Sequence, residues 1–169
     1  AYLVGFVEKG AILGHFYSTF GEVTTGKKSK QKVLSSVGNV SLWSPNNVSL
    51  LAPLTLILVS ITGSKLRVKL GSTGSDLCTP LVDLIKRTFS SGPLVDWINN
   101  DLLIQRFDRE SEKNIEWSEW ADVRIVFGSD LGCESVSSLS CREGSKTFAF
   151  SNKTSQIWCS FDDMDKVQR

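Results

Sequence analysis

The sequence predicts an all-β fold, a sandwich or jelly roll with one or two short helices in its connections. Short segments with β signals are numerous, and Gly, Ser, Asn and Pro residues separate them. In the segment 65–70, Lys65, Arg67 and Lys69 alternate with apolar residues, as in a strand with one buried face. Residues 122–127 alternate in the same way, with apolar side chains on one face and charged ones on the other.

Taken in chain order, the candidate elements are strands interrupted by one helix. The expected strands are 11–20, 33–42, 64–70, 81–89, 102–107, 122–127, 147–150 and 156–161. Residues 51–61 are the exception, because three leucines and Ile61 recur at helical spacing and Pro53 lies early, where its missing N–H costs little. A tight Gly63-Ser64 turn joins this helix to the next strand. About eight strands in one chain favour a sandwich or jelly roll.

Length and charge exclude several classes of protein. The 169 residues suit one domain, 1–169, that can bury a hydrophobic core without disulfide bonds or a structural metal. Nineteen basic and 18 acidic residues leave a net charge of +1, which argues against a strong polyanion binder. The apolar run 48–61 is shorter than the roughly 20 residues that span a bilayer, so no membrane partner is expected. The start at Ala1, without a signal-peptide pattern, suggests a trimmed or proteolytic product.

The cysteines and glycosylation sequons leave a second class open. The four cysteines are Cys78, Cys133, Cys141 and Cys159, and the sequons begin at Asn39, Asn47 and Asn152. Two disulfides and a glycan would be typical of a secreted β-sandwich module that binds glycans. Free, mostly buried thiols are favoured, since unpaired cysteine is among the most often buried residues. No cysteine pair has the spacing of metal ligands.

The sequence matches known enzyme motifs only incompletely. His15 is the only histidine, and no Gly-x-Ser-x-Gly elbow accompanies it, so it is interpreted as a packed or edge-strand residue. The acidic residues between 108 and 119 alternate with basic ones and are interpreted as a solvated loop rather than a glycosidase carboxylate pair. The glycines of 71–74 lack a phosphate-loop lysine and predict a turn. No catalytic residue, cofactor or metal site is predicted, and the chain is interpreted as a non-enzyme.

Two residue sets are candidates for partner contacts. The strongest basic run is a candidate for nonspecific RNA contact and comprises Lys27, Lys28, Lys30 and Lys32. No aromatic side chain lies within it to stack on a base, so a plain surface loop is the simpler interpretation. Five tryptophans are many for this length, and Trp43, Trp97 and Trp117 are candidate interface anchors. Filling of a single core is the alternative.

Several blocks resemble a known family. Ser44-Pro45, then Ser49-Leu50-Leu51, then the run 63–70 is similar to the helix and following strand of jelly-roll capsid proteins in picorna-like viruses. A Ser118-Glu119-Trp120-Ala121 block ahead of 123–127 resembles the small coat proteins of the plant branch, the secovirus family. The resemblance covers roughly 33–127, whereas 133–169 matches nothing and 81–107 conforms poorly. The short chain suggests a virus that divides its shell among three proteins, as the cheraviruses do.

The resemblance implies a wedge-shaped, eight-stranded jelly-roll β-sandwich. A structural capsid protein of this kind co-assembles with sister capsid proteins and with copies of itself into an icosahedral, pseudo-T=3 shell that encloses single-stranded RNA. Its expected location is the virion, after synthesis in the host cell cytoplasm. Ala1 would then mark a polyprotein cleavage site.

Overall fold

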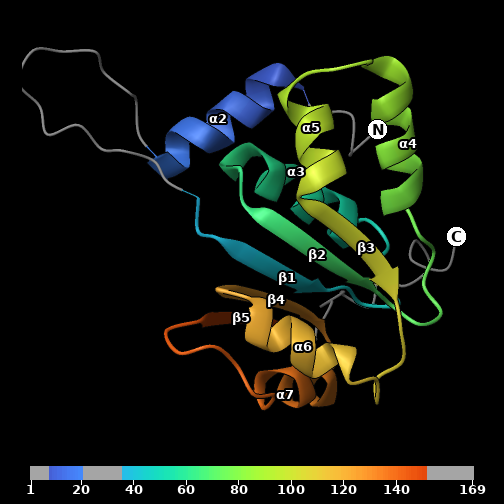
Figure 1. Cartoon of the computed structure of the whole chain (residues 1–169), viewed down its shortest axis with the longest axis vertical. Helices are drawn as coiled ribbons and strands as arrows, with labels where there is room; N and C mark the ends of the chain where they lie inside the picture. The colour runs from blue at the N-terminus through green and yellow to red at the C-terminus, as the bar shows by residue number, and fades with distance from the viewer. Residues whose placement is uncertain (1–7, 21–35, 152–169) are drawn as a thin grey trace, which may run out of the picture.

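The chain folds as a layered α/β structure with one parallel sheet between two groups of helices (Figure 1). A computed structural model describes residues 8–20 and 36–151. The sheet has five strands, and every pair of neighbouring strands runs parallel. The prediction of an all-β, eight-stranded jelly roll is therefore wrong. Parallel neighbours need crossover connections, and helices supply them here.

Strands and helices alternate along the chain. In order, the elements are α2 (Lys9–Phe20), β1 (Asn39–Trp43), α3 (Leu51–Thr62), β2 (Lys65–Leu70), α4 (Cys78–Thr88), α5 (Pro93–Asn100), β3 (Leu102–Arg106), α6 (Lys113–Trp120), β4 (Val123–Gly128), α7 (Asp130–Ser137) and β5 (Lys146–Ser151). The strand order in the sheet is β3-β2-β1-β4-β5, with β1 at the centre. This is the order of a doubly wound sheet, in which the chain starts at the middle and winds outward twice.

The first crossover follows directly from its sequence. The α3 helix is apolar along most of its length, and Pro53 lies in its first turn, where no intrahelical N–H bond is lost. Gly63 ends the helix in the left-handed region, at φ 67°, and its N–H donates to the carbonyl of Ser60. The chain then enters β2 at once, so the predicted helix, turn and strand are confirmed here.

One face of the sheet, called here the apolar face, packs against α3, α4 and α5. Leu66, Val68 and Leu70 of β2 point to this face and are almost completely buried. They join Val40 and Leu42 of β1 and residues of the three helices in the larger hydrophobic core. Full burial of side chains of this size stabilises the fold by roughly 1.5–3 kcal/mol each.

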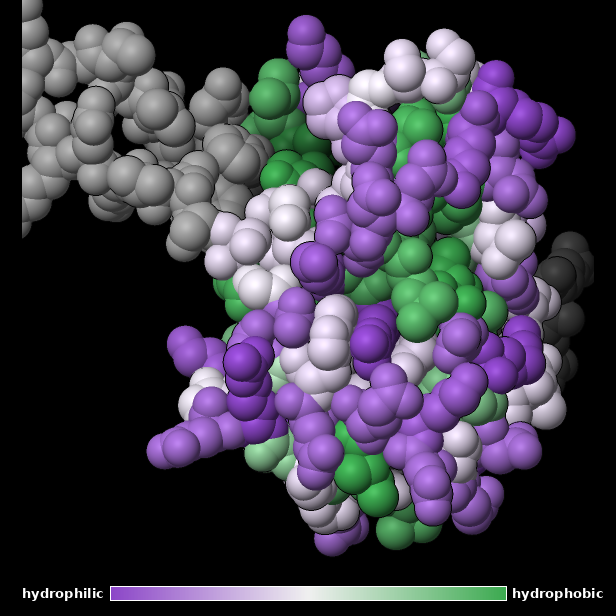
Figure 2. Space-filling view, viewed as in Figure 1, coloured by the Kyte–Doolittle hydropathy of each residue, from purple (hydrophilic) through white to green (hydrophobic). Residues whose placement is uncertain are grey.

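The opposite face, called here the polar face, lies under α6 and α7 and mixes aromatic, charged and hydroxyl side chains. Trp43, Trp117, Val126 and Cys133 form its small core. On the side shown in Figure 2, the surface over α6 and α7 is mainly hydrophilic, while apolar side chains gather farther up, over α2 and between α4 and α5. None of the helices in the described residues is both long and apolar enough to span a membrane.

Two predicted strands and one predicted loop are helices. Residues 11–20 belong to α2, and residues 81–89 fall mostly in α4. Cys78, Val82 and Ile85 recur at helical spacing and face the core. The short apolar runs in this segment resemble a strand and hid this helical period. The charged stretch 108–119 also contains most of α6.

The remaining strand predictions divide in two. Strands at 64–70, 102–107, 122–127 and 147–150 are confirmed to within a residue or two as β2, β3, β4 and β5. The strand expected over 33–42 is shorter and shifted, as β1, and the one expected at 156–161 lies outside the described residues.

Candidate functional site

The best-placed pocket lies where the two halves of the sheet meet, beyond the carboxyl ends of β1 and β4. From β1 the chain crosses through α3 on the apolar face, and from β4 it crosses through α7 on the polar face. The two connections therefore diverge and leave a crevice, which is the position where open α/β sheets bind ligands. A pocket of about 320 Å³ occupies this crevice.

One wall of the pocket is a pair of interlocked loops. Asn46, in the loop after β1, accepts a hydrogen bond from the Thr73 amide and donates to Ser72 Oγ, both at 3.4 Å. A Cβ on Gly71 would overlap Asn46 Oδ1, so glycine is required for this close approach. Arg106, at the end of β3, donates to the backbone carbonyls of Gly71 and Gly74 and ties the second loop to the sheet.

The opposite wall is the start of α7. Ser129 caps the helix, and its hydroxyl accepts a hydrogen bond from the Gly132 amide at 3.2 Å. Gly128, Ser129 and Gly132 all line the pocket. Asp130 adds an acidic residue to the first turn of the helix but does not line the pocket.

The floor holds a buried side-chain network. Asn114, only 6% exposed, accepts a hydrogen bond from the Trp43 indole N–H at 3.0 Å. Its amide nitrogen donates to the carbonyls of Asp108, Arg109 and Ser111, at 2.8–3.1 Å. One buried side chain thus fixes the loop that carries Arg109 to the mouth of the pocket.

The pocket is positively charged. Lys69 and Arg109 line it, together with hydroxyl and amide side chains such as Ser44, Asn46 and Ser72, and no Asp or Glu among the described residues is in its lining. Burial and the charge of Arg109 hold the pKa of Lys69 below its ordinary value, although Asp108 acts in the opposite direction. A partly buried lysine and a neighbouring arginine that repels it favour an anionic ligand between them.

The three tryptophans predicted as interface anchors are buried within this one chain. Trp43, Trp97 and Trp117 are 4%, 7% and 1% exposed. The Trp97 indole N–H donates to the Ser64 carbonyl at 2.8 Å, as buried polar groups require. Their positions favour the core-filling alternative. Of the three, only Trp43 lines the pocket.

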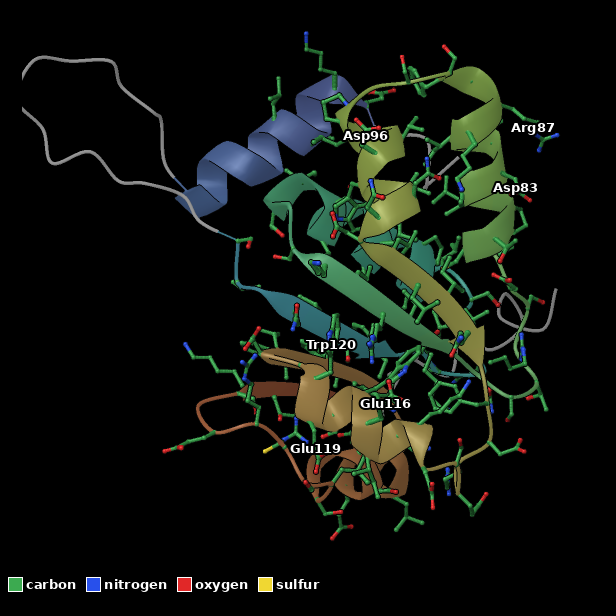
Figure 3. The ribbon with its side chains drawn as sticks, in the orientation of Figure 1. Asp83, Arg87, Asp96, Glu116, Glu119 and Trp120 are labelled. Carbon is green, nitrogen blue, oxygen red and sulfur yellow. The ribbon has the colours of Figure 1, made fainter. Side chains whose placement is uncertain are left out.

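The basic run, the histidine and the acidic cluster that the sequence singled out lie away from the pocket or outside the described residues. Lys27, Lys28, Lys30 and Lys32 lie in the undescribed segment 21–35. His15 is on α2, a helix and not a strand. In Figure 3 the labelled Glu116 and Glu119 project from α6; Glu116 pairs with Arg67 at 2.9 Å, and Glu119 accepts a hydrogen bond from the Ser140 hydroxyl.

The cysteines have no metal or redox partner in the part of the chain that the structure describes. Cys78, Cys133 and Cys141 are free, and no cluster of metal-ligating side chains occurs there. Burial raises the pKa of the Cys78 thiol to about 12, with a further contribution from the charge of Asp76. Burial likewise raises the pKa of Cys133. These two thiols are therefore protonated near neutral pH and fill space in the core.

Sequence reasoning missed this pocket because its walls come from separate connections. Lys69 was visible only as one member of an alternating strand, and 71–74 only as a turn. The available signal was positional: polar loops follow the ends of β1, β2, β3 and β4, and in a parallel sheet these ends lie at one edge. A comparison with family models, with curated proteins and with solved structures found no match.

Proposed function

We propose that this chain is a nucleotide-binding domain that holds a phosphate-bearing nucleotide in the pocket beyond β1 and β4. The observation that carries the proposal is the lining of this pocket, which contains two cations and, among the described residues, no carboxylate, at the switch point of a doubly wound sheet. Phosphate groups are bound by such cations together with hydroxyl, amide and backbone N–H donors.

The pocket also offers an apolar part. Val126, Val136 and Leu139 line its side toward α7, opposite the polar loops that follow β1 and β2, and Phe127 at the end of β4 adds a further apolar side chain. Ligand pockets usually combine an apolar surface with a few polar groups that fix orientation. A base or nicotinamide-like ring against Val136 and Leu139, with phosphates toward the cations and the start of α7, would satisfy both parts.

The glycine pattern predicts where the phosphates enter. The loop after β1 begins Ser44-Pro45-Asn46-Asn47 and lacks the Gly-x-Gly-x-x-Gly fingerprint of dinucleotide-binding folds. Glycines instead flank the cap of α7, at Gly128 and Gly132. We therefore expect the backbone at β4 and α7 to approach the phosphates, in place of the first turn.

Blocking the pocket tests the proposal. An added Cβ at Gly128 meets no atom within 4 Å, so Gly128→Leu should fold normally while its side chain obstructs the pocket. Gly10→Leu, on α2, introduces the same side chain into open space elsewhere and serves as the control. Binding of ATP, AMP, NAD⁺ and NADP⁺ is measured by isothermal titration calorimetry. At least one should bind to the wild type and to Gly10→Leu, and binding should weaken at least tenfold in Gly128→Leu. Absence of binding by all four at millimolar concentration would sink the proposal.

The capsid function stays a prediction, but the fold that supported it is replaced by a parallel sheet. The same holds for the secreted β-sandwich module, since both depended on an all-β architecture. The side-chain amide of Asn39, which begins one of its sequons, donates to the Trp120 carbonyl at 3.0 Å. Expression with candidate coat proteins, followed by electron microscopy, remains the direct test of shell assembly.

A further inference from the structure

The polar face of β2 carries three basic side chains, and one of them differs from the others. Lys65 pairs with Asp101 at 3.4 Å, and Arg67 pairs with Glu116 at 2.9 Å. Lys69, two residues farther along the same face, forms no ion pair with any described residue and lines the pocket instead. A partly buried cation without an anion is costly, so its persistence at a pocket wall points to a ligand that supplies the negative charge.

The surroundings of Lys69 hold its ammonium group in place. Its Nζ lies 5.1 Å from the centroid of the Phe107 ring, within range for a cation–π interaction. Arg109 reaches the same pocket from the loop that Asn114 fixes by three hydrogen bonds. Two cations from different elements therefore converge on one site, and the only nearby carboxylate among the described residues that raises the pKa of Lys69, Asp108, is exposed and does not line the pocket.

The position of Lys69 along the chain indicates which kind of anion it binds. In dinucleotide-binding domains of the doubly wound class, an acidic residue about 20 residues beyond the first turn accepts a hydrogen bond from the ribose 2′-hydroxyl, and a basic residue nearby accommodates a 2′-phosphate instead. Lys69 follows the loop 44–50 at a comparable distance and lies one residue before the end of the second strand, where the first half of such a site lies.

We infer that the site prefers a nucleotide with a phosphate on the ribose 2′ position over one with a free ribose diol, and that Lys69 and Arg109 bind this phosphate. The inference rests on the proposed function, because it names the ligand class of the same pocket. A carboxylate in this position would repel the phosphate, whereas a lysine and an arginine gain a charge-assisted hydrogen bond each.

Binding measurements with paired ligands test the preference. NADP⁺ and NAD⁺ are titrated into the full chain by calorimetry, with adenosine 2′-monophosphate and inorganic phosphate as additional probes. We expect NADP⁺ to bind at least tenfold more tightly than NAD⁺, and adenosine 2′-monophosphate to compete with it. Lys69→Gln should abolish the preference. Lys65→Gln is the matched control, because it removes the same charge from the same face of β2 at the opposite end of the strand.

The outcomes separate the two proposals. Binding of both dinucleotides with equal affinity would overturn the 2′-phosphate inference and leave the nucleotide site standing. Binding of ATP or AMP but of neither dinucleotide would overturn the inference alone, whereas binding of none of the four nucleotides would remove the nucleotide proposal itself. Competition by inorganic phosphate as effective as that by adenosine 2′-monophosphate would show a general anion site and would also overturn the inference. If Lys69→Gln does not fold by circular dichroism, Arg109→Gln on the exposed loop decides, with at least a threefold loss of NADP⁺ affinity expected and unchanged affinity counting against it.

Discussion

Replacing Asn114 with alanine should destabilise the fold and loosen the pocket at the same time. The indole N–H of Trp43, buried with its ring at 4% exposure, would lose its acceptor. A buried donor left without a partner costs about 1–3 kcal/mol, and the three carbonyls of loop 108–111, which water can reach, add roughly 1 kcal/mol, so we expect a loss of about 2–4 kcal/mol.

Urea denaturation followed by circular dichroism measures this loss. Asn100→Ala is the control, because Asn100 also donates its side-chain amide to a carbonyl, that of Asp96 at 2.8 Å, but on an exposed helix surface. Its cost should stay within about 0.5 kcal/mol. A double-mutant cycle with Trp43→Phe isolates the indole bond. In the phenylalanine background, Asn114→Ala should cost about 1–3 kcal/mol less than in the wild type.

Two results would refute this reasoning about the network. The first is a loss below about 0.5 kcal/mol for Asn114→Ala, the level of a plain surface substitution. The second is a full loss that Trp43→Phe leaves unchanged, which would mean that the indole bond contributes nothing and that the stability comes from the loop alone.

Three further perturbations follow from individual contacts. Trp117→Ala should cost about 3–5 kcal/mol in urea denaturation, because this side chain is 1% exposed; a folded variant of near wild-type stability would contradict its place in the core. Gly63→Ala should cost about 1 kcal/mol, since alanine fits poorly at φ 67°, and an unchanged melting temperature would count against the left-handed cap. Burial alone would raise the pKa of Asp76, but hydrogen bonds from the side chain and amide of Thr79 and from the amide of Cys78, together with the charge of Arg106, lower it. Its stabilisation is therefore present above the unfolded pKa of about 4 and is lost as pH falls through the lower folded pKa, so Asp76→Ala should destabilise by roughly 1 kcal/mol at pH 7 and by progressively less at lower pH. An equal destabilisation at pH 7 and pH 2 would contradict this.

Local patterns predicted the strands better than they predicted how the strands pair. The alternation of β2 and β4 was readable because one face of each is apolar. The sheet is nevertheless parallel, and that follows from distance along the chain: β1 ends at Trp43 and β2 begins at Lys65, too far apart for a hairpin, with a helix between them. A strand, helix and strand in succession was the signal for a crossover unit, and it outweighs the number of short β-like segments.

The helices that were missed share a cause. In α4, Leu81 and Ile85 lie beside exposed polar residues, and only the wider spacing from Cys78 through Val82 and Ile85 identifies the buried face. The pocket could not be predicted from the sequence for a related reason. Its residues become neighbours only after β1 and β4 pair, and no local pattern encodes that pairing.

The central place of β1 also governs the order in which the sheet is completed. One neighbour of β1, the strand β2, follows after a single helix. The other neighbour, β4, comes much later in the chain: the hydrogen bond from the backbone N–H of Asn39 to the Asp122 carboxylate spans 83 residues. A chain emerging from the ribosome would therefore hold β1, β2 and β3 together while the other edge of β1 stays unpaired. Closing so long a loop is slow, and an open strand edge is a template for other chains. The yield of native protein on refolding should accordingly fall as chain concentration rises, more steeply than for proteins whose adjacent strands are joined by hairpins.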